Sequence, residues 1–149
     1  MRAVIQRVRQ AELHIDGELH ASIDKGIVAL VAVGNQDETK DIQFISDKIL
    51  NLRIFPDEND SMNLSLTDVG GDLMIVSQFT LYGDCRKGRR PSYSNAMSPE
   101  SAREIYEGFL EHIRSHKGKV VSGRFQAMMD VTLCNWGPVT LLLDSKKTF

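Results

Sequence analysis

This sequence of 149 residues lacks long apolar runs and has only two cysteines. No window approaches the roughly 18 apolar residues that a membrane helix requires, and Met1 to Gln10 does not have the pattern of a signal peptide. Cys85 and Cys134 lie far apart, with no Cys-x-x-Cys or Cys/His cluster around either. We therefore expect a cytoplasmic protein with no disulfide framework, no zinc site and no membrane partner.

Net charge is also small. A formal charge of -2 speaks against a protein that grips DNA or other long nucleic acid over its whole surface, because that mode needs many cations against phosphates. The cations that could make a local RNA contact lie close together at Arg86, Lys87, Arg89 and Arg90. A solvated loop is the alternative interpretation of this cluster.

The usual catalytic motifs are missing as well. There is no Gly-x-Ser-x-Gly elbow, no phosphate-binding glycine loop and no dinucleotide fingerprint. His112 and His116 have a spacing that could place two imidazoles on one helix face, but the glutamate of hydrolytic zinc helices is absent. We expect no metal and no cofactor.

The residues that are present predict one domain over 1–149, with enough hydrophobic content (42%) for one sizeable core. Alternation of apolar and polar residues from Ala3 to Ile15 predicts a half-buried strand, and Asp16-Gly17 predicts a hairpin turn. The continuous apolar run Ile27 to Val33 predicts a central strand.

Two helices and further strands follow. Ile42, Ile45, Ile49 and Leu52 recur at helical spacing, and a second helix is predicted from Ser98 as N-cap, with Pro99 in its first turn, to a stop at Gly118. Further strands are expected at 73–79, 129–134 and 139–143, with loops at 56–63 and 81–97. The predicted fold is mixed α/β, with a mainly antiparallel sheet and two helices.

Two segments are not explained by local structure alone. Ser77-Gln78-Phe79-Thr80-Leu81-Tyr82 ends a strand with hydroxyls and an amide, where groups are often presented to a ligand. Asn135-Trp136-Gly137-Pro138-Val139-Thr140 joins two strands. A strand end satisfying its own hydrogen bonds and an ordinary turn are the alternatives, and only about 5 to 6% of X-Pro bonds in folded proteins are cis.

Together these segments resemble the paired signatures of the D-aminoacyl-tRNA deacylase (D-Tyr-tRNA(Tyr) deacylase) family, Ser-Gln-Phe-Thr at 77–80 and Asn-x-Gly-Pro-x-Thr at 135–140. The resemblance extends to the opening residues 1–8, to Lys-Gly-Arg-Arg-Pro-Ser at 87–92, and to Gly-Arg-Phe at 123–125 with Ala127 and Met129. It implies a compact, β-barrel-like sheet with flanking helices, assembled as a homodimer with active sites at the interface. It also implies chiral proofreading in translation, by hydrolysis of the ester between a D-amino acid and the 3′ end of tRNA.

The resemblance also implies roles for single residues. Ser77, Gln78, Phe79 and Thr80 would line the aminoacyl pocket, with main-chain amides near Phe79 and Thr80 stabilising the oxyanion. Phe125, Ala127 and Met129 belong to the segment that would bind the terminal adenosine, and core packing is the alternative for Phe125 and Met129.

By the same resemblance, Gly137-Pro138 would be a cis dipeptide inserted into the partner's active site, with Arg7 fixing its orientation. Backbone carbonyls there would clash with an L side chain, so that D-aminoacyl groups and the achiral glycyl group are accepted.

The chemical step has two interpretations. Thr80 could act as a nucleophile or proton shuttle, although the sequence positions no base to activate it. The substrate's own 2′-hydroxyl could instead handle the proton, which explains the lack of an obvious histidine or carboxylate base, and we favour this route.

Two residues depart from the family pattern. Trp136 stands where a small or acidic residue is usual, and Gln126 stands where a glycine is usual. Three other functions stay open, namely a non-catalytic module binding tRNA ends or nucleotides, a structural oligomer, and a relaxed deacylase that removes glycine or an L-amino acid.

Overall fold

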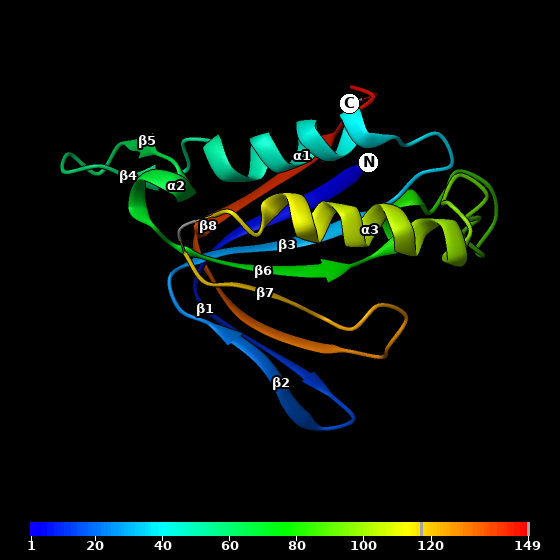
Figure 1. Cartoon of the computed structure of the whole chain (residues 1–149), viewed down its shortest axis with the longest axis horizontal. Coiled ribbons are helices and arrows are strands. Elements are labelled where there is room, and N and C mark those ends of the chain that lie inside the picture. The colour runs from blue at the N-terminus through cyan, green and yellow to red at the C-terminus, as the bar shows by residue number, and fades with distance from the viewer. Residues whose placement is uncertain (117, 149) are drawn as a thin grey trace.

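The fold of the computed structural model is a strongly curved sheet with helices on one side (Figure 1). Residues 1–116 and 118–148 are described. The sheet contains six strands, with the order β2-β1-β3-β6-β7 and with β8 paired to the other edge of β1. Its strands are β1 (Arg2–Ile15), β2 (Glu18–Ile23), β3 (Gly26–Ala32), β6 (Asp72–Ser77), β7 (Val120–Ser122) and β8 (Asp130–Asp144).

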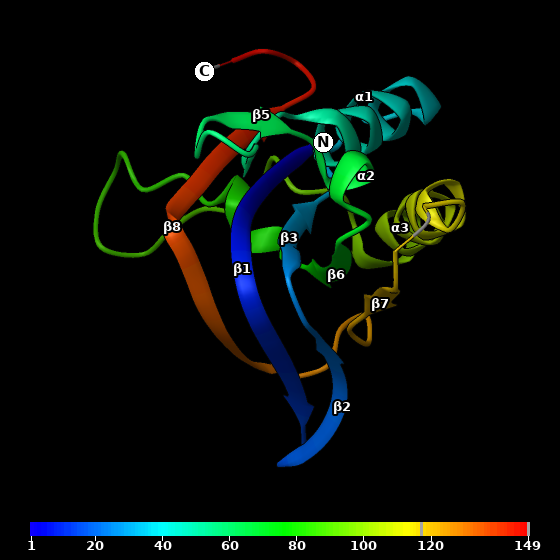
Figure 2. The ribbon, with the colours of Figure 1, turned by 90° about the vertical axis from the view of Figure 1, so that its left-hand side faces the viewer.

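Strand β1 is the centre of the assembly because it pairs antiparallel with β2, β3 and β8. The β1–β2 hairpin turns at Asp16 and Gly17, both with positive φ, as a two-residue hairpin turn requires. The β3–β6 and β6–β7 pairs are parallel. Seen from the side, β8, β1 and β2 curl around so that the sheet is nearly closed (Figure 2).

The main helices are α1 (Thr39–Asn51) and α3 (Pro99–Ile113), which lie together over one face of the sheet (Figure 1). Their apolar stripes cover β1, β3 and β6, and Ile45, Ile49 and Phe109 are fully buried. A second apolar cluster around Val8, Leu13 and Met74 fills the inside of the curl. Buried apolar side chains therefore pack on both faces of the sheet, beneath the helices on one face and inside the curl on the other.

The predicted mixed α/β architecture is confirmed, with several local differences. A short third helix, α2 (Leu66–Val69), is present because Ser65 and Asp68 form a capping box. The expected loop at 56–63 contains a small ribbon of β4 (Phe55–Pro56) and β5 (Met62–Leu64). The two expected final strands are one long strand, β8, and the short strand β7 was not predicted.

The predicted strand at 73–79 and the predicted second helix both end earlier in the structure than expected. Strand β6 ends at Ser77, and Phe79–Tyr82 forms a single 3-10 turn, η1. Helix α3 ends at Ile113 and not at Gly118. His116 therefore lies beyond the helix, where its Nε2 atom is 2.8 Å from the carbonyl oxygen of Gly71.

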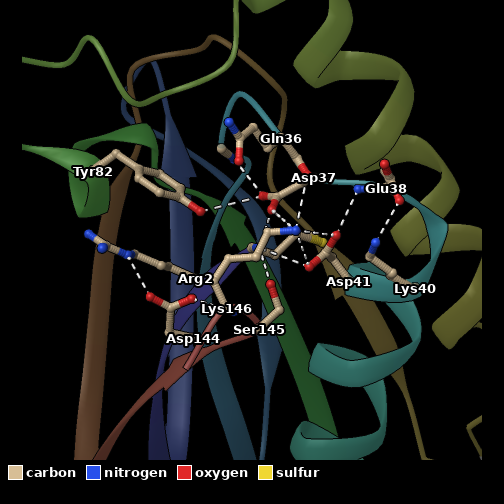
Figure 3. A network of polar contacts seen from close by, with 12 residues as sticks. Arg2, Gln36, Asp37, Glu38, Lys40, Asp41, Tyr82, Asp144, Ser145 and Lys146 are labelled. Atoms are coloured by element: carbon tan, nitrogen blue, oxygen red, sulfur yellow. Dashed lines mark hydrogen bonds and ion pairs between the residues drawn. The ribbon is translucent and has the colours of Figure 1, made fainter. Parts of the chain in front are cut away.

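A buried polar network ties the first strand to the last one near the start of α1 (Figure 3). The amino group of Met1 lies 2.6 Å from Asp37 Oδ1, and Lys146 Nζ lies 2.8 Å from Asp41 Oδ1. Burial opposes ionisation of Asp41, but hydrogen bonds from Lys146, Ser145 and the backbone of Glu38 outweigh it and lower its pKa to about 2. The network therefore stabilises the folded state when Asp41 is ionised.

The low pKa of Asp41 predicts a loss of stability in acid. The carboxyl titrates near its ordinary value when the chain is unfolded, so its contribution is complete above about pH 5 and is lost as the pH falls towards about 2. We expect Asp41→Asn to be about 1–2 kcal/mol less stable than the wild type at pH 6, with the gap closing near pH 2. Urea unfolding at several pH values measures this, with Asp47→Asn on the exposed face of α1 as the control. A gap that persists unchanged in acid would contradict the assignment.

Candidate active site

A cavity of about 710 Å³ opens at the carboxyl ends of the parallel strands β3 and β6. This is where open α/β sheets commonly bind ligands. The first turn of α3 closes one side through Ser98, Pro99 and Ala102, and the segment between β7 and β8 closes another. The remaining lining residues are Val31, Ala32, Val33, Val76, Ser77, Gln78, Phe79, Tyr93, Ala96, Met97, Tyr106, Phe125, Gln126, Ala127, Met128, Met129 and Val131.

The Ser77–Thr80 segment lies at this cavity. Ser77, Gln78 and Phe79 line the cavity, whereas Thr80 lies next to it with an exposed side chain. Phe79 and Thr80 begin η1, and N–H groups at the start of a helix have no acceptor within that helix. These two amides are therefore available to an acceptor from outside.

The hydroxyl of Thr80 has one hydrogen-bond partner among the described residues. The side-chain amide of Gln78 donates to its Oγ1 atom. An amide N–H cannot remove a proton, so this contact orients the hydroxyl without activating it as a nucleophile.

The wall at 123–131 brings three predicted residues together. Phe125, Ala127 and Met129 line the cavity and are half-buried, so they face it and are not purely core residues. The ring of Phe125 lies 5.5 Å from that of Tyr106.

Arg103, Met128 and Tyr93, which the sequence did not single out, contact or extend this part of the lining. The Arg103 guanidinium lies 5.0 Å from the centre of the Phe125 ring, and its Nη2 atom donates to Gln126 Oε1 over 3.0 Å. Gln126 has a φ of 65°, which explains why glycine suits this position. The highly exposed Met128 and the ring of Tyr93 extend the lining, but no motif pointed to them.

The basic cluster lies on a small hairpin-like loop closed by backbone bonds between Asp84 and Ser92. Arg86 is paired with Asp84 through Nε at 2.9 Å and Nη2 at 2.6 Å, and this hydrogen bonding holds the pKa of Asp84 well below its usual range. Lys87, Arg89 and Arg90 are exposed at the tip. Asp84 thus neutralises Arg86. Among the described residues, the remaining positive charge of the cluster lies at the tip, on Lys87, Arg89 and Arg90.

Gly137 and Pro138 lie outside this chain's cavity lining and are exposed. Their peptide bond is cis. In the β1–β8 ladder, Val8 pairs with Asn135 and Gln6 pairs with Thr140, so residues 136–139 bulge out opposite Arg7 alone. Asn135 closes the base of the bulge, because its Oδ1 accepts from Val139 N and its Nδ2 donates to Thr140 Oγ1.

Arg7 is buried beneath this bulge. Its Nε donates to the Trp136 carbonyl over 2.9 Å, and its Nη1 donates to the carbonyl of Ile54. Burial and the neighbouring charge of Arg9 lower the pKa of Arg7 from its ordinary value. A Cβ on Gly137 would lie 2.8 Å from Arg7 Nη2, and the φ of Gly137 is 130°, so glycine is needed there.

No charged side chain lines the cavity within the described part of the chain. The described residues also contain no group of three or more histidine, cysteine, aspartate or glutamate side chains arranged to hold a metal ion. None of the described helices is long and apolar enough to span a membrane. Among the described residues, the groups that this cavity offers to a ligand are therefore backbone groups and neutral side chains.

Comparisons with known proteins identify the same family over nearly the whole chain. A family model described as D-Tyr-tRNA(Tyr) deacylase matches residues 4–144. Proteins named D-aminoacyl-tRNA deacylase from Thermosipho africanus (strain TCF52B) and Fervidobacterium nodosum (strain ATCC 35602 / DSM 5306 / Rt17-B1) are each 55% identical over 149 residues, which is 100% of both chains.

Two solved structures share the fold. One titled "c-Myc DNA Unwinding Element Binding Protein" superposes with a TM-score of 0.92 and 38% identity over 97% of this chain and 99% of that one. Another, titled "Structural Analysis of a probable eukaryotic D-amino acid tRNA deacylase", has a TM-score of 0.82 and 17% identity over 95% and 97%.

These findings define a hydrolase that acts on the ester bond of an aminoacyl-tRNA. More narrowly, the chain belongs to the D-Tyr-tRNA(Tyr) deacylase family.

The buried contacts of Arg7 predict a stability effect. Arg7→Met removes two hydrogen bonds from a charged donor and leaves the carbonyls of Trp136 and Ile54 without that donor. We therefore expect a loss of about 2–4 kcal/mol in the free energy of unfolding. Arg9→Met, which loses an exposed contact with the Trp136 ring, should lose less than about 1 kcal/mol. Urea unfolding followed by circular dichroism compares the two variants, and equal losses would contradict a structural role for Arg7.

Proposed function

We propose that this chain hydrolyses the ester of D-aminoacyl-tRNA, and also of glycyl-tRNA, through main-chain oxyanion stabilisation. The observation that carries the proposal is a cavity without charged side chains, beside the free amides of Phe79 and Thr80. Two fixed N–H donors directed at the substrate carbonyl would stabilise the charge that develops on its oxygen, and one such donor has been worth about 10² to 10³ in rate.

The proton transfer that accompanies attack by water would be carried out by the 2′-hydroxyl of the terminal ribose. A general base in the protein would have to lie within hydrogen-bond reach of the reacting water, and the described lining offers no histidine or carboxylate. In this route Ser77 and Gln78 would shape the pocket, and Thr80 beside it would help to position the ester. RNA would be required at the 3′ end because DNA lacks the 2′-hydroxyl.

The terminal adenosine would bind against the wall formed by Phe125, Ala127 and Met129. An aromatic ring and a polarizable thioether are suited to the face and edge of a nucleobase. The acceptor end would then leave the cavity near Tyr93, towards Lys87, Arg89 and Arg90 on the exposed loop, where phosphates would meet positive charge. Arg86 would contribute less because Asp84 already neutralises it.

A second copy of the chain would complete each site. Strand β8 is 15 residues long and, among the described residues, pairs only with β1, so its outer edge is open to a partner. Gly137 and Pro138 project from that strand, exposed and outside their own chain's cavity. In a homodimer they would enter the partner's cavity, where their carbonyls would reject an L side chain.

A non-catalytic module that binds nucleic-acid ends is the competing function. The solved relative whose title names a DNA unwinding element keeps this alternative open. We favour turnover because the relatives named as deacylases are more similar, at 55% identity over the whole chain.

The direct test is an incubation of the purified protein, with chelator present, with D-tyrosyl-tRNA and L-tyrosyl-tRNA in parallel. We expect fast release of tyrosine from the D-ester alone, at least about 100-fold faster than from the L-ester. Tight binding of both tRNAs without release from either would support the binding module and contradict the proposal.

The chemical step is tested by changing one hydroxyl at a time. Thr80→Ala should keep most of the activity, whereas a tRNA ending in 2′-deoxyadenosine should bind but be cleaved at least about 100-fold more slowly. Single-turnover rates at saturating enzyme separate chemistry from binding. A near-total loss in Thr80→Ala, with the 2′-deoxy substrate still cleaved, would make Thr80 the nucleophile.

A further inference from the structure

The side chain of Trp136 is surrounded by positive charge at the start of the Gly137–Pro138 turn. The guanidinium carbons of Arg7 and Arg9 lie 4.4 Å and 4.8 Å from the centre of its ring, and the ammonium of Lys25 lies 5.3 Å away. The ring of Phe55 packs beside it, with 6.3 Å between the ring centres. Four residues from three separate segments therefore meet on one indole.

These contacts fix one end of the bulge in β8. The backbone of residues 136–139 leaves the ladder opposite Arg7, so its conformation is not set by regular strand pairing. Asn135 closes the base, and Arg7 holds the Trp136 carbonyl. The half-buried indole adds a side-chain anchor directly before the exposed Gly137 and Pro138.

The choice of side chain matters for this anchor. A tryptophan ring attracts cations through its negative face more strongly than other aromatic rings do. Arg7, Arg9 and Lys25 carry like charges, and each lies within 5.3 Å of the centre of the indole ring, whose negative face attracts all three. A small side chain at this position would leave the three cations without this aromatic partner.

We infer that Trp136 is a positioning residue, whose indole sets the direction in which the Gly137–Pro138 turn projects. The inference rests on the proposed function of that turn in rejecting L-aminoacyl groups. Trp136 is not one of the residues that line this chain's cavity, so it would act through the turn. Loss of the ring would let the turn move, and the chirality of the reaction would suffer before its rate on D-esters.

The test compares kcat/KM for D-tyrosyl-tRNA and L-tyrosyl-tRNA in Trp136→Ala and Trp136→Phe. We expect the D-to-L ratio to fall about ten-fold or more in Trp136→Ala and to stay within about three-fold of the wild type in Trp136→Phe, because phenylalanine retains a weaker cation-binding face. Leu19→Ala, at an exposed apolar residue of β2, is the matched control and should leave the ratio unchanged. Sedimentation and circular dichroism show whether each variant keeps the wild-type assembly and fold.

An unchanged ratio in a folded Trp136→Ala protein overturns the inference, whereas a wild type without any preference for the D-ester overturns the proposed function instead. If Trp136→Ala does not fold, Arg9→Gln and Lys25→Met each remove one cation and keep the ring. Each should lower the ratio about two- to five-fold, and wild-type ratios in both overturn the inference.

The chain offers a spectroscopic check because Trp136 is its only tryptophan. Iodide should quench the fluorescence more strongly than neutral acrylamide does, since the surrounding cations attract the anion. Arg9→Gln and Lys25→Met should remove that excess. Equal iodide quenching in the wild type and both variants would contradict the cation cluster.

Discussion

The pairing of β1 with β8, interrupted opposite Arg7, is the constraint on which the rest of the structure depends. One strand holds β2, β3 and β8 through its backbone, so any displacement of β1 would reach the whole curved sheet. At the interruption, a buried guanidinium takes over from ladder hydrogen bonds and joins Ile54 to Trp136. The same contact that stabilises the sheet thus presents the Gly137–Pro138 turn.

The cavity and the turn lie on different parts of one scaffold. Parallel pairing of β3 with β6 brings the ends of both strands to the mouth of the cavity, while the antiparallel β1–β8 pair carries the turn. The cavity has no charged lining among the described residues, so what it offers for selectivity is its shape, its backbone groups and its neutral side chains. In the proposed function, such groups would suit a substrate whose side chain varies and whose chirality decides the outcome.

The sequence predicted the elements whose signals are local. Alternation in β1, the Asp16-Gly17 turn, the apolar run of β3 and Pro99 at the start of α3 predicted the first hairpin, a central strand and the second main helix, whereas the barrel-like curl was implied by the family resemblance. It did not predict β7, whose three residues are too few to show a period, or the single long β8, because Gly137-Pro138 looks like the end of a strand. The roles of Arg103 and Lys25 depend on contacts with residues distant in sequence, which no local pattern carries.

The most direct measurement of the central claim, that the turn of one chain acts in the cavity of a second, uses mixed dimers. Gly137→Ala chains, whose turn would be displaced by Arg7, are refolded with a ten-fold excess of Phe79→Pro chains, which lack one proposed amide donor but keep the native turn. If the turn acts across the dimer, hydrolysis of L-tyrosyl-tRNA per Gly137→Ala chain should fall to about a tenth of its value in the unmixed variant, with D-ester hydrolysis retained. If L-ester hydrolysis per chain does not change on mixing, the turn acts within its own subunit and the account is wrong.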